Sequence, residues 1–141
     1  MSLRLARAVV STDGYVAHDG RAGWAFVARV EAHAARDSGS LAGVRSHLAE
    51  WVAVSRALAW AEATLARGDA LELRTDSALV AKGLASRRPE MSGEAGALRA
   101  ACRQALARLA ANGVPAKVVR VPREENDEAD ALARAAALGE A

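Results

Sequence analysis

Four acidic residues are the side chains in this sequence best suited to chemistry. Asp13 follows an apolar, strand-like run, Asp76 ends another, Glu50 lies in a helical pattern, and Asp130 lies in the last helical pattern. Carboxylates that approach one another raise their pKa values unless a cation neutralises them. Oxygen ligands suit hard divalent ions, among which magnesium is the natural candidate. Their joint placement therefore indicates a metal site.

Each acid also has a simpler interpretation. Asp13 before Gly14 is a common turn former, and Asp76 before a serine could simply begin a helix. Glu50 could be a solvated helix residue, while Asp130 suits the positive end of a helix dipole. Taken singly, each simpler interpretation is favoured, so the metal site depends on the four acids meeting in space.

The remaining metal-binding residue types do not offer an alternative centre. His18, His33 and His47 lie apart, without the spacing of a zinc site. The single cysteine, Cys102, lies among alanines in a helical pattern, which favours a small buried thiol.

Hydrophobic patterning predicts the elements that would position the acids. The first half indicates strands at Leu3–Ser11, Trp24–Val30 and Ala32–Leu41, a turn at Asp13-Gly14, and a helix at His47–Arg67 with Ser46 as N-cap and Gly68 at its end. The second half indicates a strand at Ala70–Asp76, a helix from Ser77 to Ala85, a break at 87–89, a helix at Glu94–Ala111, a strand at Ala116–Val121, a loop at Pro122–Glu125, and a helix from Asn126, its cap, to Leu138.

This order predicts an α/β fold with a mixed sheet and helices on both faces. Right-handed crossovers would place the later strands parallel to the first. Because parallel neighbours end at the same edge of a sheet, Asp13 and Asp76 could lie side by side there.

Composition limits the class of protein without deciding its partner. A length of 141 residues fits a single domain spanning 1–141. With 52% hydrophobic and 26% charged residues, no apolar run long enough for a membrane span and no signal-peptide core, we expect a cytoplasmic protein. The net charge of +2 is too small to argue for nucleic-acid binding, and the pI near 9.2 leaves that possibility open.

Short motifs in a defined order point to a family. They are Thr12-Asp13-Gly14, Ala22-Gly23-Trp24-Ala25, Ala49-Glu50 with Ala57-Leu58, Thr75-Asp76-Ser77, and the run from Asn126 to Ala133. Over nearly its whole length the sequence resembles type 1 ribonuclease H. The resemblance implies a ribonuclease H-like fold, in which a five-stranded mixed sheet has the order 3-2-1-4-5, with strand 2 antiparallel and helices on both faces.

The same resemblance implies an activity. In that family the four acids, here Asp13, Glu50, Asp76 and Asp130, bind two Mg²⁺ ions, with Mn²⁺ possible, and the RNA strand of an RNA–DNA hybrid is hydrolysed. Paired ions about 4 Å apart suit an in-line phosphoryl displacement that needs no covalent nucleophile. The implied protein is a monomer with no obligate protein partner and no membrane association.

Some family positions differ here. A loop histidine is matched by Arg123, which cannot shuttle protons at neutral pH but can hold a phosphate or promote product release. Paired asparagines that contact the hybrid are matched by Ser46 and His47, which can both still hydrogen bond, and telling RNA from DNA depends on contacts with 2′-hydroxyls. The resemblance also places three substrate-binding residues beside the acids, Gly14, Ser77 and Asn126.

Two alternatives remain open. One is a nuclease of the same fold that acts on DNA. The other is a non-catalytic domain that binds nucleic acid or protein, since a fold does not guarantee a function. The presence of all four acids argues against the second. Trp24, Trp51 and Trp60 lie in apolar patterns and are expected in the core rather than as stacking platforms for bases.

Overall fold

The computed structural model describes residues 6–43, 46–85 and 93–140, which form a sheet of five strands with helices on both sides. The elements are β1 (Arg7–Val16), β2 (Arg21–Val30), β3 (His33–Ala42), α1 (Ser46–Thr64), β4 (Ala70–Thr75), α2 (Ala78–Ala85), α3 (Gly93–Ala111), β5 (Ala116–Arg120), the 3₁₀ helix η1 (Arg123–Asn126) and α4 (Asp127–Leu138). The strand order is β3-β2-β1-β4-β5. β2 is antiparallel to both β1 and β3, whereas β4 and β5 run parallel to β1, so the predicted topology is confirmed.

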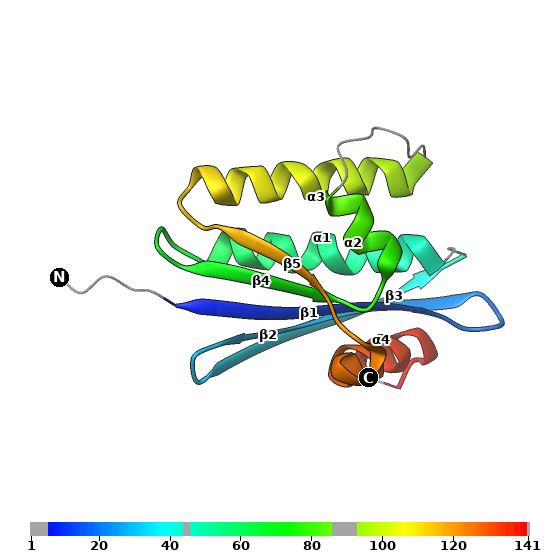
Figure 1. Ribbon diagram of the computed structural model, residues 1–141. Helices are drawn as coiled ribbons and strands as arrows, with labels where there is room; N and C mark the ends of the chain where they lie inside the picture. Colours follow the sequence, from blue (N-terminus) through cyan, green and yellow to red (C-terminus); the bar gives the residue numbers. More distant parts are fainter. Residues whose placement is uncertain (1–5, 44–45, 86–92, 141) are drawn as a thin grey trace.

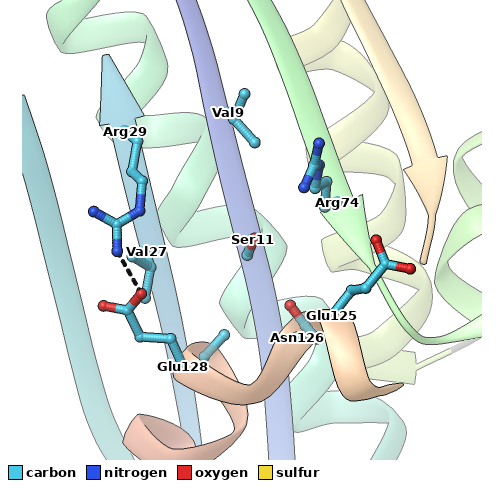
Figure 2. Close-up of a pocket in the computed structure, with 9 residues that line it drawn as sticks. Val9, Ser11, Val27, Arg29, Arg74, Glu125, Asn126 and Glu128 are labelled. Carbon is cyan, nitrogen blue, oxygen red and sulfur yellow. Dashed lines mark hydrogen bonds and ion pairs between the residues drawn. The ribbon is translucent and has the colours of Figure 1, made fainter. Parts of the chain in front are cut away.

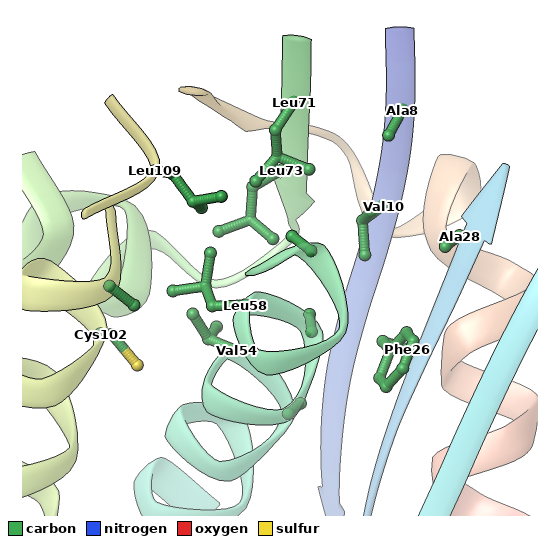
Figure 3. Close-up of a cluster of buried hydrophobic side chains, with 14 of the residues drawn as sticks. Ala8, Val10, Phe26, Ala28, Val54, Leu58, Leu71, Leu73, Cys102 and Leu109 are labelled. Carbon is green, nitrogen blue, oxygen red and sulfur yellow. The ribbon is translucent and has the colours of Figure 1, made fainter. Parts of the chain in front are cut away.

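The helices divide between the two faces of the sheet. α1, α2 and α3 cover one face and α4 covers part of the other (Figure 1). The main core lies between the sheet and α1, where Val10, Val54, Leu58 and Leu73 are all at most 1% exposed (Figure 3). Burying each of these side chains contributes about 1.5–3 kcal/mol. None of the described helices is long and apolar enough to cross a membrane.

Helix α1 lies close to the sheet because every fourth residue of one stripe is small. Alanines at 49, 53, 57 and 61 are all at most 1% exposed. Residues at this spacing share one face of a helix, so the stripe allows close approach to β1. The same approach brings the first turn of α1 against the end of β1, where two of the acids lie.

The first strand differs from its prediction. Asp13-Gly14 does not end β1; the strand continues to Val16, and Gly14 pairs with Trp24 in the antiparallel ladder. The turn follows at Ala17–Gly20, where Ala17 N–H donates to the Arg21 carbonyl and Gly20 has a φ of 88°. Pairing with β2 thus outweighs the local turn preference of Asp-Gly, and residues 1–5, at the predicted start of the strand, lie outside the described residues.

Other boundaries shift by a few residues. α1 ends at Thr64 rather than Arg67, and the buried Asp69 accepts hydrogen bonds from the N–H groups of Ala66 and Ala6 just beyond it. The predicted loop at 122–125 is largely the 3₁₀ helix η1, and α4 begins at Asp127. The predicted break at 87–89 lies outside the described residues.

The aromatic residues and the cysteine lie where the sequence predicts. Trp24 and Trp51 are buried, at 6% and 0% exposed, and Trp60 packs against the core beside Phe26, with ring centroids 6.3 Å apart. Cys102 is buried, and burial raises the pKa of its thiol to about 12. Core packing is therefore confirmed for all four of these predicted core residues.

Candidate active site

Three acids converge where β1 and β4 part. The parallel ladder between these strands runs as far as Thr12 and Thr75, so the next residues, Asp13 and Asp76, leave the ladder together. Glu50 approaches from the first turns of α1. One carboxylate oxygen from each of the three acids lies within 4.8 Å of the others. The structure thus places Asp13 and Asp76 side by side, although β1 itself continues to Val16.

Hydrogen bonds fix the end of the β1–β4 ladder. The Thr12 hydroxyl donates to the Arg74 carbonyl at 3.2 Å, which ties β1 to β4 immediately before the acids. Ser77 N–H donates to the Thr75 hydroxyl at 3.0 Å, while Ser77 Oγ accepts from Val80 N–H at 3.1 Å. Ser77 therefore caps α2, as predicted, and holds the turn that carries Asp76.

Glu50 presents a free acceptor to this cluster. The Gly14 backbone amide lowers the pKa of the Glu50 carboxyl, and Oε2 of that carboxyl is buried without a hydrogen-bond partner in the described part of the chain. A buried carboxylate oxygen without a partner is costly unless a cation or a proton satisfies it. The donor set, three carboxylates with one orphaned oxygen, fits a hard divalent cation.

Electrostatics lead to the same conclusion. Burial, followed by the charges of Glu50 and Asp76 and by Asp130, raises the pKa of Asp13 to about 9. Burial and then the charge of Asp76 raise the pKa of Glu50 to about 7, against lowering contributions from Asp13, from the Gly14 backbone amide and, smallest, from the charge of Arg123. Without a cation the cluster therefore retains protons at neutral pH. A divalent ion would displace them, because it favours the charged carboxylates.

The fourth acid joins from the opposite face of the sheet. Asp130, on the first turns of α4, hydrogen bonds to Asp13 but does not belong to the group within 4.8 Å. The Asp130 carboxylate also pairs with Arg134, whose Nη2 lies 3.5 Å from Asp130 Oδ2. The structure thus gathers three of the four predicted ligands and sets the fourth against one of them.

Comparison with solved structures identifies the fold. A ribonuclease H1 from Halobacterium salinarum is 26% identical, with 96% of this chain and 99% of that chain covered at a TM-score of 0.77. This chain has the type 1 ribonuclease H fold. The N-terminal ribonuclease H domain of a Mycobacterium tuberculosis protein is 20% identical, with 96% of both chains covered at a TM-score of 0.77.

A third neighbour of the ribonuclease H fold is bound to nucleic acid. LC11 ribonuclease H1, solved in complex with an RNA/DNA hybrid, is 20% identical, with 94% of this chain and 97% of that chain covered at a TM-score of 0.77. No family model and no curated protein matches the sequence. The resemblance inferred from the motifs is therefore confirmed by structure.

The residues predicted to contact substrate occupy different environments in this ribonuclease H fold. α1 begins at Ser46, whose side chain lies outside the described part of the chain, and His47 is exposed on its first turn. Arg123 is exposed in η1, close enough to the acids for its charge to lower the pKa of Glu50. Gly14 and Ser77 lie beside the cluster, as described above.

Asn126 is buried, at 1% exposed. Its Nδ2 donates to the Thr12 carbonyl at 2.9 Å, and its side chain does not cap α4, although the residue holds the N-cap position. Because a carbonyl only accepts, this bond fixes the orientation of the amide and leaves Oδ1 as a buried acceptor without a described partner. Oδ1 faces a cavity of about 180 Å³ on the α4 face of the sheet (Figure 2).

This clamp between η1 and β1 is the feature that the sequence did not reveal. Asn126 joins the chain segment before Asp130 to the residue before Asp13, and so links the two acids through the backbone. The sequence shows only an asparagine before a helix, which normally indicates a cap. Nothing in the helix pattern distinguishes a capping asparagine from one that turns inward.

Proposed function

We propose that this chain is a metal-dependent endonuclease that hydrolyses the RNA strand of RNA–DNA hybrids. The observation that carries the proposal is the group of carboxylates from Asp13, Glu50 and Asp76 within 4.8 Å, at the end of the β1–β4 ladder of a ribonuclease H fold. The neighbour solved in complex with an RNA/DNA hybrid supports this choice of substrate.

The acids would act as ligands rather than as nucleophiles. Asp13, Glu50, Asp76 and Asp130 would hold two Mg²⁺ ions, or Mn²⁺. Bound there, the ions supply activation of the attacking water and stabilisation of the leaving oxygen. Glu50 contributes its free Oε2, and Asp13 releases the proton that it holds at neutral pH. Hydrolysis by water agrees with the burial of the single cysteine, which removes it as a nucleophile.

Residues around the acids would then select the substrate. Arg123 is exposed, its charge acts on Glu50, and it would bind a phosphate or promote departure of the product. Ser46 and His47 begin the helix that carries Glu50, and hydrogen bonds from them to 2′-hydroxyls would distinguish RNA from DNA. Gly14, Ser77 and Asn126 would support substrate binding by holding the strand ends in place.

A cleavage assay tests the proposal. End-labelled RNA–DNA hybrid, duplex RNA and duplex DNA are incubated with the protein in Mg²⁺, in Mn²⁺ and in a chelator. We expect cleavage of the RNA of the hybrid only, and only with metal. Glu50→Gln should reduce turnover at least 100-fold, on the order of the loss of other electrostatic catalytic groups. Glu62→Gln, which alters an acid paired with Arg108 at the other end of α1, is the matched control and should retain activity.

Other outcomes would favour the alternatives. Cleavage of duplex DNA in place of the hybrid would indicate a DNA-directed nuclease of the same fold. Hybrid binding without cleavage, and calorimetric Mg²⁺ titrations that are unchanged by Asp13→Asn and Asp76→Asn, would indicate a non-catalytic binding domain.

A further inference from the structure

Strand β1 and helix α4 make two successive polar contacts at the edge of the acid cluster. Asp13 on β1 hydrogen bonds to Asp130 on α4. At the next position on the same side of β1, Tyr15 lies under the guanidinium of Arg134, whose Cζ is 4.6 Å from the ring centroid. The advance along a strand over two residues, about 6.7 Å, nearly equals the advance along a helix over four, about 6 Å. Arg134 therefore lies one step beyond the acids along the same surface.

The contacts of Arg134 hold it without burying it. Its side chain is 50% exposed, and its Nη2 lies 3.5 Å from Asp130 Oδ2, so the ion pair is long and open to water. An exposed pair at this helical spacing contributes little to stability. Stacking on Tyr15 restrains the guanidinium group, while half of the side chain stays exposed to solvent. Arg134 is therefore a preorganised cation that can still donate hydrogen bonds to a ligand.

The pairing with Asp130 is also conditional. Asp130 is one of the proposed metal ligands, so a bound cation would compete with Arg134 for the same carboxylate. The ion pair between Arg134 and Asp130, the one acid paired with Arg134 in the described residues, would then weaken. Tyr15 would still hold the guanidinium in place. An anion arriving over the metal site would meet this cation next.

We propose that Arg134, held on Tyr15, binds a backbone phosphate of the nucleic acid beside the one at the acid cluster. The inference rests on the proposed function, because it requires a nucleic acid over the acids. One phosphate occurs per about 3.4 Å of helix axis on each strand, so a cation about 6 Å along the surface reaches a different phosphate from the one at the acids. The planar, fork-like guanidinium suits bidentate phosphate binding.

The experiment measures hybrid binding against salt. Fluorescence anisotropy is recorded for labelled hybrid in an Asp76→Asn background, which prevents cleavage, at fixed Mg²⁺ and increasing KCl. Adding Arg134→Gln should raise Kd about tenfold or more and reduce the slope of log Kd against log salt by about one. Arg134→Lys should preserve the slope, because it keeps the charge. Tyr15→Leu should raise Kd by a smaller factor, because it removes the stacking platform.

Arg108→Gln is the matched control. Arg108 is 56% exposed and paired with a carboxylate, as Arg134 is, but it lies on α3 and bonds to Glu62. Its replacement should leave both Kd and slope unchanged, and thermal melts should confirm that all variants fold.

Two failures can be told apart. If the Asp76→Asn parent binds hybrid and Arg134→Gln binds with the same Kd and slope, the inference is overturned while the proposed function stands. Arg134 would then serve only to neutralise Asp130, and its replacement should tighten Mg²⁺ binding in calorimetry. If the parent does not bind hybrid and the unmodified chain does not cleave it, the proposed function fails, and the inference that rests on it fails too.

Discussion

Gly14 and Glu50 touch through their backbones: a Cβ at position 14 would lie 2.4 Å from the Glu50 amide nitrogen. The backbone amide of the same glycine also lowers the pKa of the Glu50 carboxyl. The close packing of α1 on β1 and the placement of a candidate metal ligand therefore depend on the absence of one side chain. Because φ at Gly14 is not positive, the requirement is for space rather than for a left-handed backbone.

Gly14→Ala should push α1 away from β1. We expect the free energy of unfolding to fall by about 1–3 kcal/mol, the usual cost of overpacking, and Mg²⁺ affinity to fall with it, because Glu50 moves. Chemical denaturation and calorimetry measure the two effects. Gly39→Ala, whose Cβ would meet the Trp24 indole instead, is the control: it should lower stability but leave Mg²⁺ affinity intact. Equal metal affinity in Gly14→Ala would contradict the prediction.

The cation-free protein should lose stability as pH rises from about 4 to about 9. Asp13 and Glu50 have folded pKa values raised to about 9 and about 7, above their ordinary values of 3.8 and 4.5. In this window the unfolded chain has released protons that the folded chain still holds, so rising pH favours unfolding. Asp13→Asn should therefore stabilise the cation-free protein at pH 8 by at least about 1.4 kcal/mol, the equivalent of one pKa unit.

Denaturant titrations in chelator at pH 5 and pH 8 check this prediction. Asp37→Asn, which alters an exposed acid on β3, should behave like the unmodified chain at both pH values. Saturating Mg²⁺ should reverse the order at pH 8, because only the unmodified chain gains from the ion. A cation-free protein that grows more stable between pH 5 and pH 8, with no gain from Asp13→Asn, would exclude the proton-retaining cluster.

Asn126→Ala should weaken the link between η1 and β1. The Thr12 carbonyl would lose its amide donor, and the loss of a buried hydrogen bond costs about 1–3 kcal/mol. Asn126→Asp should be at least as damaging at neutral pH, because it places a carboxylate oxygen against that carbonyl. Both variants should also require more Mg²⁺ for half-maximal cleavage. The exposed Asn112→Ala should change stability by no more than about 0.5 kcal/mol, and an equally mild Asn126→Ala would show that the clamp is dispensable.

Arg123→Ala should separate metal binding from turnover. The charge of Arg123 lowers the pKa of Glu50, so its removal should raise that pKa and move the acid limb of the pH–rate profile to higher pH. At pH 9, where Glu50 is ionised in both proteins, the variant should bind Mg²⁺ more tightly, because a repelling cation is gone, yet cleave about tenfold more slowly. Profiles of kcat against pH test this, with the exposed Arg67→Ala as control. An unchanged profile would contradict the role in turnover that is proposed for Arg123.

The sequence predicted what depends on local pattern and on motif order. Alternation in Ala70–Thr75 and the cap at Ser77 placed Asp76 correctly, and the parallel arrangement of β1 and β4 then placed Asp13 beside it. The prediction was wrong where pairing with another strand outweighed a local preference, since Asp13-Gly14 reads as a turn yet lies inside β1.

Side-chain contacts between distant segments could not be predicted from the sequence. The bond from Asn126 to Thr12 joins segments that are 114 positions apart, and helix pattern says nothing about which way a polar side chain turns. The pairing of Arg134 with Tyr15 likewise depends on how far α4 advances along β1. The placement of Asp13 beside Asp76 could be predicted, whereas the side chains that hold them there could not.

The burial of Cys102 gives the molecule a native reporter of its own opening. The sequence has one thiol, it is 1% exposed, and its pKa is raised to about 12. Alkylating reagents attack thiolates, so the folded molecule should be inert and the unfolded one reactive. The labelling rate at neutral pH therefore reports how often α3 opens away from the core and exposes Cys102. No engineered probe is needed for this measurement.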